Sequence, residues 1–355
     1  MAHSQKLRNL LATGILLALC SGCGGYHGLN SDHFDGTRFS IQGADHSFSA
    51  MLRWLWEMET VPWPEWITDP KQPPPQAEED GGKLRVTYIN HATVLIQLDK
   101  MNILTDPIWS DRAGPYSWLG VKRVRSPGVL FENLPHIDLI LLSHDHYDHL
   151  DLPSLRMIAK RDNPKVIAGL GLKSLLNGHG LAMVEELDWW QEYPLPGKNI
   201  AITFVPALHN SGRLPFMENR TLWGGYVLTH PDGNIYFAGD TGLGDFIYQI
   251  AKKFQPIRLT ILPIGNYEKR WFMKNQHMNP DDSLRVHEIL RARQSMGMHF
   301  GTFAEHPEQA IDAHERDLAA ALVDHALAPS AFWILGFGES RYVPEIKRDI
   351  VTMPK

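Results

Sequence analysis

Ser143-His144-Asp145-His146-Tyr147-Asp148-His149 is the segment from which the fold and the chemistry of this chain are inferred. It directly follows the apolar run Ile137–Leu142, which has the pattern of a buried strand. A strand that feeds a polar loop places side chains at the end of a rigid element, where the backbone fixes them. Four potential metal ligands within six residues are more than an ordinary solvated turn needs. His144 and His146 can converge on one metal ion, and Asp148 with His149 can face a second ion.

The spacing of these residues matches the H-x-H-x-D-H signature of the metallo-β-lactamase superfamily at every position, so the chain resembles that superfamily. Sites of the superfamily take further ligands from later strand ends: a histidine, a bridging aspartate and a final histidine. The chain offers His209, Asp240 and His299 in such contexts. Taken singly, the two histidines are more readily core residues than ligands, and the aspartate is readily a turn residue. The ordered set favours ligands.

Zinc, two ions per chain, is the metal expected from this ligand set. The chain has two cysteines, Cys20 and Cys23, and both lie in the N-terminal leader, so imidazole and carboxylate remain as donors. A redox iron site in related folds usually replaces one histidine of the motif by a carboxylate. A water that bridges two such ions loses its proton near a pKa of ~7 and is the expected nucleophile.

The N-terminal segment predicts export. Lys6 and Arg8 precede the apolar run Leu10–Leu19, which is short for a membrane span of ~20 residues and fits a signal peptide. The run ends at Cys23 in a sequence that resembles a bacterial lipobox. We expect a lipoprotein signal peptide over 1–23, a lipid anchor on Cys23, and a place in the bacterial cell envelope facing the periplasm. The alternatives are a secreted or soluble periplasmic protein and a retained N-terminal anchor.

Composition limits the partners of the chain. The 355 residues carry a net charge of -6 and contain no dense run of Lys and Arg, which argues against nucleic acid. We expect an N-terminal arm with a proline-rich connector over 24–83, a catalytic domain over 84–345 and a tail over 346–355. The four arm tryptophans are expected to pack onto the core of the domain rather than to touch lipid: Trp54, Trp56, Trp63 and Trp66.

Strand and helix patterns alternate from Leu84 onward, which indicates one α/β domain. Strands are expected at Arg85–Ile89, Thr93–Leu98, Ile137–Leu142, Ile200–Val205, Leu222–Leu228, Ile235–Ala238 and Leu259–Leu262. Helices are expected at Leu152–Lys160, Asp245–Phe254, Pro280–Arg293 and Ala313–His325. The third helix has Asn279 as its N-cap, then proline and two aspartates where a helix start favours them.

Blocks outside the metal motif resemble the N-acylphosphatidylethanolamine-hydrolysing phospholipase D branch of the superfamily and its bacterial relatives. The blocks are Asp32–Gly36, Ile89–Thr93, Leu104–Pro107, His144–Leu150, Leu222–Gly225, Ala238–Gly242, Pro263–Glu268, Arg270–Met273, Gln276–His277 and His299–Phe303. The resemblance implies a four-layer αβ/βα sandwich with the metal site at one edge of paired sheets. It also implies a phospholipid or other small phosphodiester as substrate.

By this resemblance each expected site residue has a role. The first zinc uses His144, His146 and His209; the second uses Asp148, His149 and His299; Asp240 bridges the two. His277 contacts the substrate phosphate or the leaving oxygen, or is a structural loop histidine. His91 and Asp106 orient ligands without binding metal, or are polar residues at strand ends.

The expected activity is phospholipase D-like cleavage of N-acylphosphatidylethanolamine by a zinc-bridging hydroxide, with Asp148, Asp240 and His277 as catalytic residues. The alternatives are a lactonase, β-lactamase or other ester or amide hydrolase of the same fold. A non-catalytic envelope lipoprotein that binds lipid or metal is the alternative of another class. A homodimer is left open.

Overall fold

The computed structural model describes residues 26, 28, 31–43, 47–79, 82–214, 217–304 and 308–346. The expected signal peptide, Cys23 and the tail after residue 346 lie outside these residues. Within the described ranges, no helix has both the length and the apolar character needed to cross a membrane.

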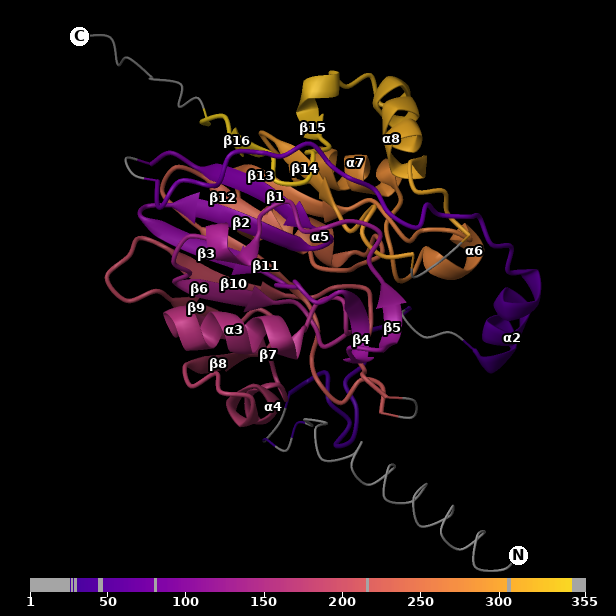
Figure 1. Cartoon of the computed structure of the whole chain (residues 1–355), viewed down its shortest axis with the longest axis horizontal. Helices are drawn as coiled ribbons and strands as arrows, with labels where there is room; N and C mark the ends of the chain where they lie inside the picture. Colours follow the sequence, from indigo (N-terminus) through magenta and orange to yellow (C-terminus); the bar gives the residue numbers. More distant parts are fainter. Residues whose placement is uncertain are drawn as a thin grey trace, which may run out of the picture.

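Two seven-stranded sheets form the body of the protein (Figure 1). The first has the strand order β16-β1-β2-β3-β6-β7-β8, and its strands are β1 (Arg85–Asn90), β2 (Thr93–Leu98), β3 (Met101–Thr105), β6 (Leu139–Leu142), β7 (Lys165–Gly169), β8 (Val184–Leu187) and β16 (Ser340–Tyr342). The second has the order β15-β14-β13-β12-β11-β10-β9, and its strands are β9 (Glu192–Pro194), β10 (Ala201–Val205), β11 (Gly225–Thr229), β12 (Asn234–Phe237), β13 (Ile257–Pro263), β14 (Ser295–Met298) and β15 (Phe332–Trp333).

Helices flank the two sheets, and a small hairpin lies beside them (Figure 1). The helices are α2 (Phe48–Glu57), α3 (Leu152–Asp162), α4 (Lys173–Gly178), α5 (Phe246–Lys253), α6 (Arg270–Met273), α7 (Pro280–Ile289) and α8 (Ala313–Asp324), with single 3-10 turns at Phe131–Asn133 and Pro329–Ala331. The hairpin consists of β4 (Arg112–Tyr116) and β5 (Leu119–Lys122).

The core divides into two main apolar layers, which is the arrangement of a sandwich. One cluster fills the space between the sheets and includes Tyr88 of β1, Phe204 of β10 and Tyr226 of β11. A second cluster joins the other face of the first sheet to α3 and α4, with Leu155 and Leu176 fully buried. Helix α7 packs on β13 and also contacts α5 and α8, so it covers the second sheet. The mixed α/β sandwich expected from the sequence is confirmed.

Each expected strand and helix has a counterpart, with shifted ends and one clear correction. The helix expected over Pro280–Arg293 ends at Ile289. Arg291 has φ +47, a left-handed backbone that a continuing α-helix does not allow. Its start is as expected, because Asn279 and Asp282 form a capping box.

The arm is not a separate appendage, and the expectation for its tryptophans is only half right. Phe39 is buried in the main core, and Trp54 stacks on Phe272 with ring centroids 5.1 Å apart. The indole nitrogen of Trp63 donates to the carbonyl of Gln309. Trp56, however, is 90% exposed and Trp66 is 49% exposed, so neither packs fully onto the core.

Strand direction brings the candidate ligands to one edge of the sandwich. In the second sheet β12, β13 and β14 run parallel, and β10 points the same way because two antiparallel pairings separate it from β12. The carboxyl ends of these strands therefore share an edge, where binding sites of α/β sheets lie. β3 and β6 of the first sheet are also parallel.

Candidate metal centre

Three histidines converge at the first of two candidate metal positions. His144 and His146 follow β6, and His209 follows β10. His146 Nδ1 lies 2.9 Å from His144 Nε2 and 3.3 Å from His209 Nε2. The three rings thus turn one nitrogen each toward a common point, as the motif predicts. A single metal ion can take all three.

The second position is built from Asp148, His149 and His299. Asp148 Oδ2 lies 2.9 Å from His149 Nε2 and 3.3 Å from His299 Nε2, and the two histidine nitrogens are 3.2 Å apart. The backbone of His299 has φ +63, a left-handed conformation that turns its side chain back toward the motif loop. The structure therefore joins the end of β14 to the loop after β6.

Asp240 lies between the two groups, where a bridging ligand belongs. Its Oδ2 is 3.0 Å from His299 Nε2, 3.2 Å from His149 Nε2 and 3.8 Å from His209 Nε2. The other oxygen, Oδ1, is buried and has no hydrogen-bond partner among the described residues. An ionised carboxylate oxygen that is buried without a partner is costly unless a cation neutralises it.

The donor set fits divalent metal. Four ligands at ~2.0–2.1 Å around a tetrahedral zinc lie roughly 3.3–3.4 Å from one another. The measured separations within the two groups, 2.9–3.3 Å, are close to this spacing. Lone pairs of imidazole nitrogens repel one another at this distance unless a proton or a metal lies between them. The cluster is therefore able to bind metal through imidazole and carboxylate donors.

Asp106 holds one histidine of each group. It follows β3, and its Oδ2 accepts hydrogen bonds from His149 Nδ1 at 2.8 Å and from Ser143 Oγ at 2.6 Å. Ser143 Oγ in turn lies 2.9 Å from His144 Nδ1. Ser143 Oγ donates to Asp106 and can accept from His144 Nδ1, so the Nε2 atoms of His144 and His149 face the two positions and are the atoms that would bind metal. Asp106 thus contacts His149 directly and reaches His144 through Ser143.

His91 holds Asp148 from the turn between β1 and β2. Its Nε2 lies 2.7 Å from Asp148 Oδ2, and its backbone is left-handed with φ +44. The carbonyl of His91 accepts from the amide of His299 at 2.8 Å, and its amide donates to Thr302 Oγ1 at 3.0 Å. This residue therefore joins the first sheet to the segment that carries the last ligand.

His277 reaches the same centre from the segment between α6 and α7. Its Nδ1 lies 3.8 Å from Asp240 Oδ2, and its ring centroid is 5.1 Å from that of His209. The neighbouring Gln276 carbonyl accepts from His209 Nδ1 at 3.1 Å, which leaves Nε2 of His209 for metal. The structure thus places His277 beside Asp240, the candidate bridging ligand, rather than in a remote loop.

Charge is unevenly distributed over the centre. The neighbouring Asp148 and Asp240 carboxylates overcome the effect of burial and raise the pKa of His149 well above its usual value. Burial opposes ionisation of His299 too, but Asp240 and the hydrogen bonds to Asp148 and Asp240 raise its pKa to about 10. Burial lowers the pKa of His209 to about 3. Without metal, protons on His149 and His299 therefore supply the positive charge that the two carboxylates need.

Asp145 lies within the motif but turns away from the centre. Its Oδ1 accepts from the amide of Gly212 at 2.6 Å, and its Oδ2 accepts from Thr221 Oγ1 at 3.0 Å. It anchors the loop after β10, which carries His209.

Sequence analysis assigned no role to Ser143. Its position directly before His144 was the signal that could have indicated its contact with that histidine.

Comparisons with known proteins agree with this geometry. A family model described as "Beta-lactamase superfamily domain" matches residues 101–300. The chain is 41% identical over 230 residues to the N-acyl-phosphatidylethanolamine-hydrolyzing phospholipase D 1 of Caenorhabditis elegans, a match that covers 62% of this chain and 64% of that protein. The chain thus spans just under two thirds of that relative's length.

Two further likenesses extend the comparison. A metal-dependent hydrolase of Methanopyrus kandleri is 28% identical over 224 residues, which cover 62% of this chain and 85% of that protein. The crystal structure of an isothiocyanate hydrolase from Delia radicum gut bacteria has a TM-score of 0.58 and 20% identity, and covers 73% of this chain and all of that chain. At this identity the structural likeness concerns the fold alone.

Proposed function

Because the chain belongs to the beta-lactamase superfamily of metal-dependent hydrolases, we propose that it is a dinuclear zinc phosphodiesterase with phospholipase D-like activity on N-acylphosphatidylethanolamine. The relative from C. elegans bears the name of that activity. The proposed products are phosphatidic acid and an N-acylethanolamine.

One observation carries the dinuclear part of the proposal. Two groups of donors, each suited to one ion, meet at Asp240, whose carboxylate lies within 3.8 Å of histidines from both groups. The donors are imidazole and carboxylate, which zinc accepts. When bound, a pair of divalent ions supplies an activated water for attack and positive charge against the phosphoryl oxygens.

The protein's own residues hold this chemistry in place. Asp106 and Ser143 keep the Nε2 lone pairs of His144 and His149 directed at the two positions. His91 fixes the Asp148 carboxylate. We propose that His277, beside Asp240 but outside both groups of three, contacts the substrate phosphate or the leaving oxygen.

We also propose that the enzyme acts in the bacterial cell envelope, anchored by lipid on Cys23 and facing the periplasm. A phospholipid substrate supports this proposal, because an anchored enzyme stays beside its substrate. Helix α2 exposes three apolar side chains that could contact lipid, those of Leu52, Leu55 and Trp56. A soluble periplasmic enzyme would meet the same substrate less often.

The test pairs metal content with a panel of substrates. Leader-free protein is loaded with zinc, measured by elemental analysis, and assayed on N-acylphosphatidylethanolamine, bis(p-nitrophenyl) phosphate, a homoserine lactone and a cephalosporin. We expect about two zinc ions per chain and phosphatidic acid as a product. Turnover of lactone or β-lactam without phosphodiesterase activity would contradict the phosphodiester substrate. Full zinc loading with no turnover would favour a binding lipoprotein.

A further inference from the structure

Arg270 lies at the start of α6 and reaches the backbone that carries His277. Its Nη1 donates to the His277 carbonyl at 2.8 Å, and its Nη2 pairs with Asp282 Oδ2 at 2.5 Å. Asp282 is itself fixed, because it forms the capping box of α7 with Asn279. One planar guanidinium therefore joins α6, the segment before α7 and the first turn of α7.

Both backbone polar groups of His277 are held. Its amide donates to the Met273 carbonyl at 2.8 Å, and its carbonyl accepts from the guanidinium. The next amide, that of Met278, donates at 2.8 Å to the carbonyl of Thr241, which directly follows the candidate bridging ligand Asp240. With the backbone fixed on both sides, only the side-chain rotamers of His277 remain to direct its ring.

Helix α6, from which the arginine extends, is anchored in turn. It lies beside α2 (Figure 1), and its Phe272 stacks on Trp54 of α2 with ring centroids 5.1 Å apart. The guanidinium therefore starts from a packed helix and ends on a capped one. Without it, the carbonyl of the buried His277 would lose its donor, and the segment would have to move to find another.

The contacts of Arg270 separate it from an arginine that binds substrate phosphate. Both of its terminal nitrogens already have protein partners, and the Asp282 carboxylate neutralises its charge. Its route to the chemistry runs through His277, whose Nδ1 lies 3.8 Å from Asp240 Oδ2.

We propose that Arg270 is a positioning residue that keeps the His277 ring beside Asp240, ready to contact the substrate phosphate or the leaving oxygen. The inference rests on the proposed function, because it deepens the role proposed there for His277.

Turnover and zinc content of the full, zinc-loaded chain give the first test. Arg270→Ala is expected to keep its zinc and to cleave bis(p-nitrophenyl) phosphate about 10- to 100-fold more slowly, because a small misplacement of a reacting group has effects of this size. Arg285→Ala is the matched control, since Arg285 pairs with Asp281 at 2.9 Å within α7 alone. A rate equal to that of the control, or loss of zinc, would overturn the proposal.

A double substitution separates positioning from general destabilisation. If Arg270 acts through His277, Arg270→Ala is expected to cost no further turnover in a chain that already carries His277→Ala. A purely structural role would lower the rate of that chain again. Additive losses would therefore contradict the assignment.

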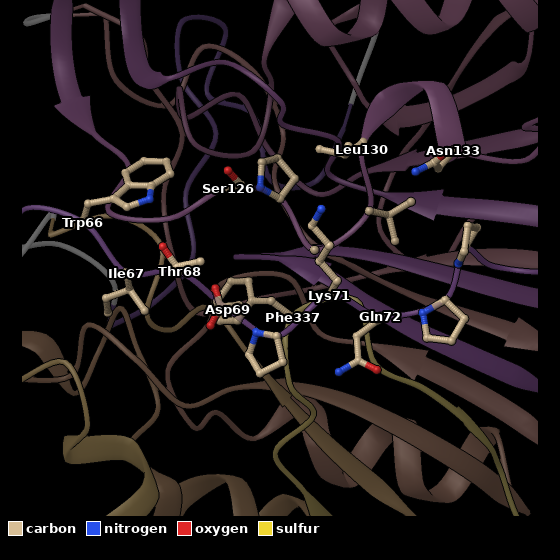
Figure 2. Close-up of a pocket in the computed structure, with 16 residues that line it drawn as sticks. Trp66, Ile67, Thr68, Asp69, Lys71, Gln72, Ser126, Leu130, Asn133 and Phe337 are labelled. Atoms are coloured by element: carbon tan, nitrogen blue, oxygen red, sulfur yellow. The ribbon is translucent and has the colours of Figure 1, made fainter.

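Added guanidinium gives a readout that a purely structural role would not produce. The Arg270 side chain is 30% exposed, so guanidinium at a non-denaturing concentration can reach the space that Arg270→Ala leaves. It is expected to restore part of the turnover of Arg270→Ala and to leave Arg285→Ala unchanged. Guanidinium can also enter the cavity of about 340 Å³ between the connector and the segment after β5 (Figure 2). Both variants retain this cavity, so equal responses of the two would overturn the assignment.

NMR of the histidine rings makes the test independent of phosphodiesterase activity. With isotope-labelled histidine, the ring signals of His277 are those that His277→Ala lacks. They are expected to shift or broaden in Arg270→Ala and to stay in place in Arg285→Ala. Unchanged His277 signals in Arg270→Ala would refute the positioning role even in a protein that cleaves no phosphodiester. If Arg270→Ala fails to fold, Arg270→Lys decides by the same criteria, because an ammonium cannot reproduce the planar two-nitrogen contact.

Discussion

Asp106 Oδ2 lies 2.8 Å from His149 Nδ1, and neither side chain is exposed to solvent. The same oxygen accepts from Ser143, which contacts His144. One carboxylate outside the two donor groups therefore orients one histidine of each. Its removal should loosen both positions at once.

Asp106→Ala is expected to lower metal affinity by roughly 10- to 100-fold, the usual effect of losing such a partner. Competition with a coloured chelator, read for both ions, measures it. Asp245→Asn is the control, because Asp245 is exposed and makes no capping hydrogen bond. Unchanged affinity in Asp106→Ala would assign the residue a purely structural role.

Asp240→Ala is expected to reduce bound metal and to abolish turnover. Its Oδ2 lies within 3.8 Å of histidines from both donor groups, so one substitution weakens two positions. Elemental analysis beside a rate measurement tests this. Normal metal content together with a normal rate would refute the bridging role.

His277→Ala is expected to keep the metal content and to lower turnover by about 100-fold or more, as for loss of a proton-transferring side chain. The reason is that His277 lies 3.8 Å from Asp240 and is not among the six side chains assigned to the two positions, although it could also approach an ion together with His209 and Asp240. Metal content and rate are measured on the same sample. Loss of metal in this variant would make His277 a ligand.

His325 is expected to stabilise the fold only while it is protonated. Its Nε2 lies 2.9 Å from Asp281 and its Nδ1 lies 2.8 Å from Glu288, which joins the end of α8 to α7. The hydrogen bond to Asp281 raises the pKa of His325 most, and the hydrogen bond to Glu288 raises it further. Burial lowers this pKa by less than the hydrogen bond to Asp281 raises it. The folded-state pKa thus exceeds the unfolded value of about 6.5. This stabilisation is complete below the unfolded pKa and is lost as pH rises through the folded pKa.

His325→Gln should therefore lower the free energy of unfolding by about 0.2–1 kcal/mol at acidic pH and change it little at alkaline pH. Urea denaturation at one pH below the unfolded pKa and at one pH above the folded pKa of His325 measures the difference. His179→Gln serves as the control, because its ring hydrogen-bonds the Leu175 carbonyl rather than a carboxylate. An equal loss at both pH values would exclude the charged interaction.

Gly265→Ala is expected to destabilise the fold by about 1–3 kcal/mol, as overpacking does. A methyl group at this position would lie 1.9 Å from the carbonyl oxygen of His299, so backbone beside a candidate ligand must move. Gly178→Ala is the matched control, because nothing lies within 4 Å of its added carbon. Thermal unfolding of the two variants should differ clearly, and equal melting temperatures would contradict the close approach.

The residues that sequence could identify are those with a local pattern. His144, His146, Asp148 and His149 stand in one short loop after an apolar strand, so spacing alone indicates metal. Asn279 likewise reveals the start of α7 through its own neighbours. In both cases the physical cause lies within a few residues of the chain.

What sequence could not show depends on contacts between distant segments. β14 reads Ser-Met-Gly-Met, a composition poor in β-branched residues, yet it is fully buried as a strand because β13 and β15 enclose it. β16 pairs with β1, although the two strands lie near opposite ends of the catalytic domain in the sequence. The hydrogen bond from Ser143 to Asp106 could not be predicted from sequence, because Asp106 follows a different strand.

Four candidate ligands come from the loop after the first sheet's β6, and three, His209, Asp240 and His299, come from the second sheet. A chain cut between β8 and β9 would leave each piece with an incomplete centre. Metal bound by all seven side chains would therefore cross-link the two sheets, and part of its binding energy would stabilise their association. A chelator added to such a nicked protein should weaken the association of the two halves, and reassembly of the two fragments with and without metal would measure the contribution of the metal.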